Sequence, residues 1–205
     1  MRNSFTGIKE PAECLIVEKK SRFYSFAYPV FSKSEINKIL DDYKKKYYDA
    51  THICYAYVVN DDGVSEKFSD DGEPSGTAGY PICSVIKKRG LTNVLVIVVR
   101  YFGKIKLGAG GLTRAYSTCS GSVLDKAGIH EYMPANKITV KFFVNNYYKF
   151  TGIINSFMVR EKTEVFEEDM CKLTLYVEQK YTDEVLSKIR LADSDAQTEL
   201  AEFYL

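Results

Sequence analysis

The sequence is poor in the residues that build metal centres and catalytic groups. It contains only two histidines, His52 and His130, and no pair of its five cysteines has a metal-ligand spacing such as C-x-x-C. An odd number of cysteines without such a spacing predicts neither a disulfide framework nor a zinc site. The cysteines lie singly in apolar segments, so we expect them to be reduced core residues. We accordingly expect no bound metal and no cofactor.

An excess of charge of one sign is absent, and so are long apolar runs. The 28 basic and 27 acidic side chains leave a net charge of +1, so binding to nucleic acid would require a local basic patch. The longest apolar run, residues 94–99, is far shorter than the roughly 20 residues that span a bilayer. The first residues lack the apolar stretch of a signal peptide. We therefore expect a cytoplasmic protein without a membrane partner.

The first part of the chain mixes strand and helix patterns. Ser32 and Glu35 have the spacing of a capping box, and Ile36 and Leu40 begin the apolar face of the helix that follows. The all-apolar run at 94–99 is typical of a strand at the centre of a covered sheet. The segments with strand patterns are 13–18, 22–30, 53–59 and 93–102, and further helices are expected at 77–88 and 111–127. Residues 60–73 are interpreted as a polar loop.

A second pattern begins beyond a boundary at residues 128–134, where Gly128 and Pro134 flank a linker that contains His130. The order of elements beyond it is βαββαβ, the ferredoxin-like arrangement, and Thr182 is expected to cap its second helix. We therefore predict an α+β protein with two domains, 1–131 and 135–205. The first is expected to be a two-layer α/β domain and the second a ferredoxin-like domain.

Residues 69–79, which we call the acidic loop, combine carboxylates with glycines and a proline just before a helix. One interpretation is a turn in which Asp70 binds backbone amides and a hydroxyl caps the helix. A second is a divalent-cation site, although the spacing does not match a calcium-binding loop. A third is a partner-facing loop. The candidate residues of a partner-facing loop or cleft are His52, Asp70, Asp71, Glu73, Ser75 and Thr77.

Residues 100–116 predict a strand that enters a glycine-rich loop and then a helix. Free amides at a helix start favour an anion, and nearby rings of Tyr101, Phe102 and Tyr116 offer surfaces on which a base can stack. The candidate residues for binding nucleic acid or another anion are Arg100, Lys104, Lys106, Gly108, Gly110, Gly111 and Arg114. A phosphate or RNA-backbone contact and a purely structural turn both remain open.

Specific nucleotide motifs do not fit this glycine-rich segment. Ala109 stands where a P-loop requires lysine, and Thr113 stands where a dinucleotide-binding loop requires glycine or alanine. His52 precedes Cys54 without the signature of a zinc deaminase, so we interpret it as a strand histidine. No catalytic constellation is evident, which favours a protein that is not an enzyme.

The two segments together resemble the signature of the YigZ/IMPACT family. The family pattern D-D-G-E-P-x-G-T-A-G-x-P is present in full at residues 70–81. The pattern R-Y-F-G-G-x-x-L-G-x-G-G-L-x-R-A-Y is matched at 100–116, except that Lys104 replaces the second glycine of R-Y-F-G-G. Lys104 adds charge and stiffens the turn. By motif, the resemblance extends over residues 14–128, and domain order extends it to the rest of the chain.

The resemblance implies a first domain similar to the second domain of a small-subunit ribosomal protein, and a second domain similar to the last domain of elongation factor G. It also implies a link to translation, because eukaryotic relatives are implied to regulate initiation in the response to amino-acid starvation stress. These relatives are implied to compete for the activator of a stress kinase alongside a separate N-terminal domain, which we expect this chain to lack. The two-domain layout resembles a bacterial form.

Three functions follow as hypotheses. The first is a translation-associated regulatory protein that binds RNA or the ribosome through the basic glycine-rich segment. The second is an enzyme that acts on a phosphorylated or nucleotide substrate in a cleft of the first domain. The third is a protein–protein regulator that uses the acidic loop and does not bind nucleic acid. The sequence does not predict an oligomeric state.

Overall fold

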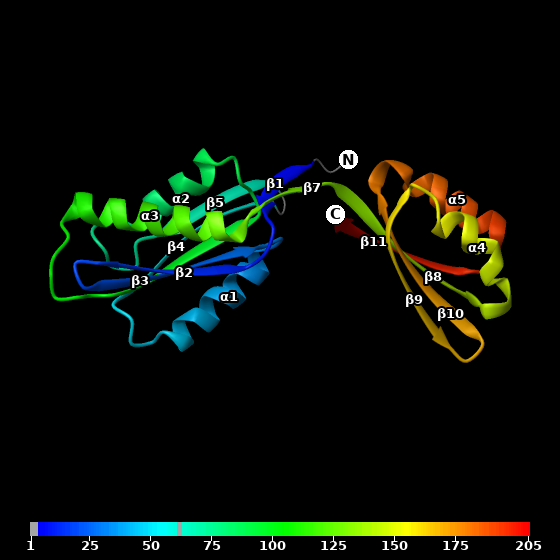
Figure 1. The fold of residues 1–205 in the computed structure, drawn as a ribbon, viewed down its shortest axis with the longest axis horizontal. Helices are drawn as coiled ribbons and strands as arrows, with labels where there is room; N and C mark the ends of the chain where they lie inside the picture. The colour runs from blue at the N-terminus through cyan, green and yellow to red at the C-terminus, as the bar shows by residue number, and fades with distance from the viewer. Residues whose placement is uncertain (1–3, 61–62) are drawn as a thin grey trace. The chain divides into compact units, whose positions relative to one another are not determined.

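The computed structural model describes residues 4–60 and 63–205. The chain divides into two compact units, one formed by Phe5–Glu131 and the other mainly by Tyr132–Leu205. Each unit has its own apolar core. The predicted α+β fold class is confirmed, since both units combine helices with antiparallel sheets (Figure 1).

The first unit is built on a five-stranded antiparallel sheet with the order β2-β3-β6-β4-β5. These strands are β2 (Ala12–Glu18), β3 (Ser21–Pro29), β4 (His52–Asn60), β5 (Val64–Ser69) and β6 (Val94–Tyr101). The all-apolar run predicted for the centre of a sheet is β6, which pairs with β3 on one side and β4 on the other. Strands far apart in the sequence therefore meet at β6.

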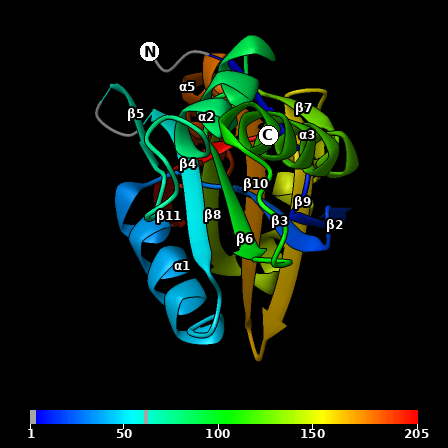
Figure 2. The same cartoon turned by 90° about the vertical axis from the view of Figure 1, so that its left-hand side faces the viewer.

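Helices cover both faces of this sheet. Helix α1 (Lys33–Lys46) packs on one face, where it meets Leu95, Ile97 and Val99 of β6. Helices α2 (Gly79–Lys88) and α3 (Ala109–Ala127) pack on the other face, which carries the alternate β6 side chains (Figure 2). The unit thus has three layers and not the two we expected, because both faces of β6 are apolar and each must be covered.

The start of α1 follows the predicted capping box with a shift of one residue. Ser32 Oγ accepts a hydrogen bond from the Glu35 amide at 3.2 Å. Glu35 Oε2 in turn accepts one from the amide of Phe31 at 2.9 Å, where a capping box would use the amide of Ser32 itself. Two amides that a helix start leaves unsatisfied are therefore bonded by side chains.

Two short strands lie where we expected a loop and a linker. Within the predicted polar loop, Val64–Ser69 forms the edge strand β5, and residues 61–62 of that loop lie outside the described residues. The predicted linker contains β7 (Ile129–Tyr132), which carries His130 and pairs with β1 (Phe5–Ile8). Exposed short strands carry polar residues on their outer faces and so look like loops in the sequence.

The second unit is a four-stranded antiparallel sheet covered by two helices. Its order, β11-β8-β10-β9, is that of the predicted βαββαβ ferredoxin-like fold. Its elements are β8 (Pro134–Phe143), η1 (Val144–Asn146), α4 (Tyr147–Ile154), β9 (Val159–Glu167), β10 (Met170–Glu178), η2 (Gln179–Tyr181), α5 (Thr182–Ala192) and β11 (Gln197–Tyr204). The expected cap at Thr182 is wrong, because Thr182 is the first residue of α5 and its Oγ1 accepts from Asn136 Nδ2.

All five cysteines are free, and four of them are buried. Burial raises the pKa of the Cys54, Cys83, Cys119 and Cys171 thiols, which favours their neutral form. The described residues contain no helix that is both long enough and apolar enough to cross a bilayer.

Candidate functional site

The acidic loop and the glycine-rich segment meet at one end of the five-stranded sheet. In the strand register His52, at the start of β4, and Phe23 of β3 both lie opposite Arg100, near the end of β6. The acidic loop leaves β5 at the same end and leads into α2. Two segments about 30 residues apart in the sequence are thereby brought into direct contact.

Asp70 holds the acidic loop in place from inside. Its carboxylate accepts hydrogen bonds from the amides of Gly76 at 2.8 Å, Ala78 at 2.9 Å and Gly79 at 2.8 Å. Burial alone would raise the pKa of Asp70, but these amides outweigh it and hold the pKa below its ordinary value of 3.8. Asp70 therefore acts as a cap for the segment that begins α2.

Glu73 and Arg100 form a buried ion pair between the two segments. Arg100 Nη1 donates to Glu73 Oε1 at 2.5 Å, and the two residues are 5% and 7% exposed, respectively. The Tyr116 hydroxyl of α3 donates to the same oxygen at 2.7 Å. The rings of Phe23 and Phe102 lie 5.3 and 5.4 Å from the guanidinium carbon of Arg100. Arg100 thus holds the loop, strand and helix together and is not exposed to an outside anion.

His52 closes the acidic loop from the other side. Its Nδ1 lies 2.7 Å from the carbonyl oxygen of Asp71, and its Nε2 lies 3.8 Å from Glu73 Oε2. The Asp71 carboxylate accepts from the amide of Ile53 at 2.6 Å. Cys54 Sγ lies 3.0 Å from the Asp70 carbonyl oxygen and 3.4 Å from the Tyr116 hydroxyl. The predicted residues of this loop are brought together, but their polar groups are largely satisfied by one another.

The remaining loop residues divide between inside and outside. Thr77 is buried and its hydroxyl donates to the Pro74 carbonyl at 2.6 Å, whereas Ser75 is exposed. Within the described part of the chain, no group of three or more His, Cys, Asp or Glu side chains is arranged to hold a metal ion. The geometry supports the interpretation of the acidic loop as a capped turn.

Gly103 brings a further basic segment beside the glycine-rich loop. A Cβ atom at Gly103 would lie 2.0 Å from the Lys20 carbonyl carbon, so this glycine packs directly on the turn between β2 and β3. The Gly103 amide also donates to Ser21 Oγ at 3.0 Å. Both loops lie at the same end of the sheet (Figure 1). Lys19 and Lys20, which lie between the strands predicted at 13–18 and 22–30 and were not among the candidate residues, therefore lie next to the candidate binding loop.

An exposed cationic region results, which we call the basic surface. Its members are Lys19, Lys20, Arg22, Lys104, Lys106 and Arg114. All six are exposed, and among the described residues none of them forms an ion pair. Arg22 also lies over the ring of Tyr101, with its guanidinium carbon 5.2 Å from the ring centre. The sequence did not identify Lys19 and Lys20 as candidate binding residues, because their proximity to Gly103 depends on the pairing of β3 with β6.

The N-terminus of α3 follows the loop that carries Lys104 and Lys106, and no side chain caps it. Gly108 is the capping residue with φ of 75°, it provides no side chain, and no acidic residue lies in the first turn. A Cβ atom at Gly110 would have no neighbour within 4 Å, and at Gly111 it would touch only the side chain of Leu107. Lys104, with φ of 64°, adopts the left-handed conformation that glycine favours. Open amides, a helix dipole and nearby cations together suit a phosphate group.

Comparisons with known proteins identify the family of the chain. The family model of the Impact N-terminal domain matches residues 19–124. The IMPACT family member YvyE of Bacillus subtilis is 44% identical over 64% of this chain and 60% of its own length. The IMPACT family member YigZ of Escherichia coli is 34% identical over 66% of each chain. The crystal structure of a hypothetical protein matches 97% of both chains with a TM-score of 0.66 at 24% identity, which supports the two-unit fold alone.

Proposed function

Because the chain belongs to the Impact N-terminal domain family, we propose that it is a translation-associated regulatory protein that binds RNA or the ribosome through the basic surface. The family predicted from the two motifs is confirmed. The chain spans about 60% of the length of the Bacillus relative that it matches, and the proposal rests on this chain's own surface.

The observation that carries the proposal is the set of exposed cations at this end of the sheet, of which Lys104, Lys106 and Arg114 adjoin the uncapped start of α3 in the sequence. Phosphate contacts by lysine and arginine release counterions, which favours binding to RNA irrespective of its sequence. The amides of Gly110 and Gly111 add donors that can approach a phosphate closely. The exposed ring of Phe102, 43% accessible, adds a surface on which a base can stack.

The buried pair of Glu73 and Arg100 has a supporting role in this proposal. It fixes the end of β6, from which the glycine-rich loop departs, and Tyr116 ties α3 to the same carboxylate. Amides and cations held by a rigid frame lose little conformational entropy when they bind a phosphate. Arg100 therefore positions the surface without contacting the RNA.

The test uses the full chain, purified ribosomal subunits and a short fluorescein-labelled oligouridine RNA. Co-sedimentation with subunits and fluorescence polarisation with the RNA are measured at low and moderate salt. In Lys104→Glu/Lys106→Glu, the slope of log affinity against log salt is expected to decrease by about 1.4, because each phosphate contact in single strands contributes roughly 0.7. Affinity at low salt is expected to fall by on the order of tenfold or more.

Two control variants separate charge from shape. Lys67→Glu/Lys88→Glu makes the same change in net charge at exposed lysines on β5 and α2, and it should leave RNA binding nearly unchanged. Lys104→Gly removes one charge but keeps a residue suited to the left-handed conformation, so it should weaken binding by less than the double reversal. Equal losses in both double variants, or no binding to either RNA or subunits at low salt, would contradict the proposal.

A further inference from the structure

Strand β2 is an open edge of the five-stranded sheet. Among the described residues it pairs with β3 alone, and α3 covers one of its faces. An edge strand exposes backbone amides and carbonyls that another extended chain can pair with. The edge is therefore a place where a partner can add a strand.

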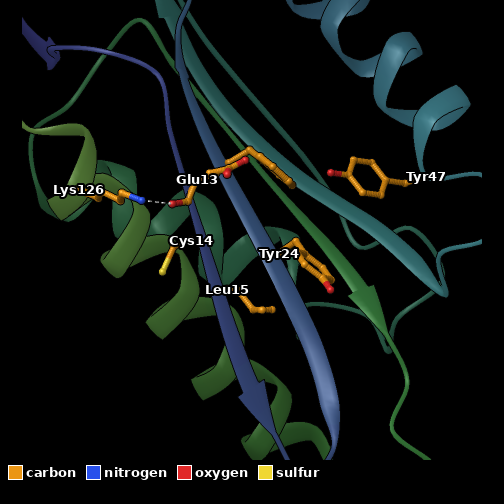
Figure 3. A pocket seen from close by; sticks show the side chains of 7 residues that line it. Glu13, Cys14, Leu15, Tyr24, Tyr47 and Lys126 are labelled. Atoms are coloured by element: carbon orange, nitrogen blue, oxygen red, sulfur yellow. Dashed lines mark hydrogen bonds between the residues drawn. The ribbon is translucent and has the colours of Figure 1, made fainter.

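The direction of the backbone groups on β2 can be assigned. Lys126 Nζ donates to the carbonyl oxygen of Glu13 at 3.0 Å, and Figure 3 shows that this carbonyl points away from β3. In an antiparallel pair, alternate residues direct their backbone groups toward and away from the neighbouring strand. Leu15 and Val17 therefore also direct their amides and carbonyls outward, where no strand of the described residues meets them.

The side chains of these residues are exposed, and Leu15 lines a groove. Leu15 is 49% and Val17 is 59% exposed, large fractions for aliphatic residues of a sheet. The groove has a pocket of about 510 Å³ between β2, Tyr24 of β3 and Tyr47 at the end of α1 (Figure 3). A second pocket, of about 230 Å³, continues it along Pro11–Glu13. Alternate side chains of an added strand would enter this groove.

The charges at the two ends of the groove differ. At the hairpin end lie Lys19, Lys20 and Arg22, which form no ion pair among the described residues. At the other end, Glu13 lies in the pocket lining and Lys126 is engaged with its carbonyl. The hairpin end is complementary to an acidic partner, and the middle of the groove is complementary to an apolar one.

We propose that β2 binds an extended peptide segment of a partner protein by strand addition. The segment carries apolar side chains at alternate positions, which lie beside Leu15 in the groove and beside Val17 on the same face of β2. Acidic residues at one end of the segment lie next to Lys19, Lys20 and Arg22. Backbone hydrogen bonds supply affinity, while the groove and the cations select the sequence.

A second copy of this chain is the competing occupant of the edge. Antiparallel pairing of two β2 strands about Leu15 would put Glu13 of one copy opposite Val17 of the other, near Lys19, Lys20 and Arg22 at the hairpin end. On the strand itself one carboxylate would then face three cations, and a segment with two or more carboxylates matches that charge better. Self-association is therefore the competing outcome of the test.

The test selects displayed random peptides on the immobilised full chain, and it measures the affinity of the enriched peptide by fluorescence polarisation. The enriched peptides should share two or three apolar residues at alternate positions with acidic residues at one end. In Val17→Pro, which lacks the outward amide, affinity should fall roughly tenfold or more. Proline is tolerated on an edge strand where its missing amide faced solvent, so the pairing with β3 should persist.

Val17→Thr is the matched control, because it keeps the amide and a β-branched side chain, and it should retain most of the affinity. A second readout is amide hydrogen exchange, in which Leu15 and Val17 should become protected when the peptide binds. Lys104→Glu/Lys106→Glu should retain peptide binding while it loses RNA, which separates this proposal from the previous one. The absence of an enriched peptide pattern, equal affinity for Val17→Pro, or protection at β2 by self-association alone would overturn the proposal.

Discussion

The buried pair of Glu73 and Arg100 and the exposed basic surface both draw on the glycine-rich segment, yet they have opposite environments. Arg100 lies in the core with a carboxylate and two aromatic rings around it, whereas Lys104, four residues later, is exposed and has no ionic partner among the described residues. Charged residues that are neighbours in a motif thus have different physical roles. A motif identifies a region, and burial decides which of its residues can meet a ligand.

The largest expected effect is the loss of the buried charge at Glu73. In Glu73→Gln, Arg100 keeps its charge without a counterion, so the free energy of unfolding should fall by about 3–5 kcal/mol. Urea unfolding, monitored by circular dichroism, measures this change in the free energy of unfolding. Glu66→Gln is the control, because Glu66 pairs with Lys87 at an exposed site and should lose at most about 1 kcal/mol. Similar losses in both variants would remove the distinction between the buried and the exposed ion pair.

Two glycines of the glycine-rich segment allow the same comparison between a packed and an open position. In Gly103→Ala the new methyl group would overlap the backbone of Lys20 and Ser21, and stability should fall by about 1–3 kcal/mol. In Gly110→Ala the methyl group meets open space in the first turn of α3, so stability should change little or rise by up to about 1 kcal/mol. Thermal unfolding of the two variants measures the difference, and a destabilised Gly110→Ala would contradict the open helix start.

The smallest expected effect is at Asp70, and it depends on pH. Since the folded-state pKa of Asp70 lies below 3.8, its charged form stabilises the fold above that pH, and the contribution is lost as pH falls through the folded pKa. Asp70→Asn should therefore cost about 1–2 kcal/mol at neutral pH. The difference from the unmodified chain should shrink when urea unfolding is repeated below about pH 4. A difference that is constant from pH 7 to pH 3 would show that the charge of Asp70 has no part in the cap.

The sequence predicted the strands and helices whose buried faces show directly as a pattern of apolar residues. The all-apolar run of β6 and the alternation in the second unit sufficed for the central strand and for the ferredoxin-like order. The edge strand β5 was not predicted, because Val64–Ser69 is largely exposed and has no apolar face to reveal it. The third layer was missed although the apolar run of β6 already required cover on both faces.

The candidate site could be predicted only in part, because its geometry depends on non-local contacts. The cations Lys104, Lys106 and Arg114 were predicted as binding residues and are exposed, and their function stays a prediction. Arg100 was placed in the same group, since nothing local distinguishes it. One signal was available: a single charge that follows an all-buried strand needs a buried partner, and Glu73 in the acidic loop was a candidate.

The central place of β6 also has a consequence for how the chain acquires its fold during synthesis. Strands β3 and β4 do not pair with each other. Both pair with β6, whose partner residues follow about 35 to 80 positions later in the sequence and are synthesised after them. Until then, β3 and β4 have no central partner, and the faces that α2 and α3 will cover are open. At about 5–20 residues per second, the ribosome sets an interval of seconds in which these apolar surfaces are exposed to chaperones. Pairings so distant in the sequence also predict slow folding.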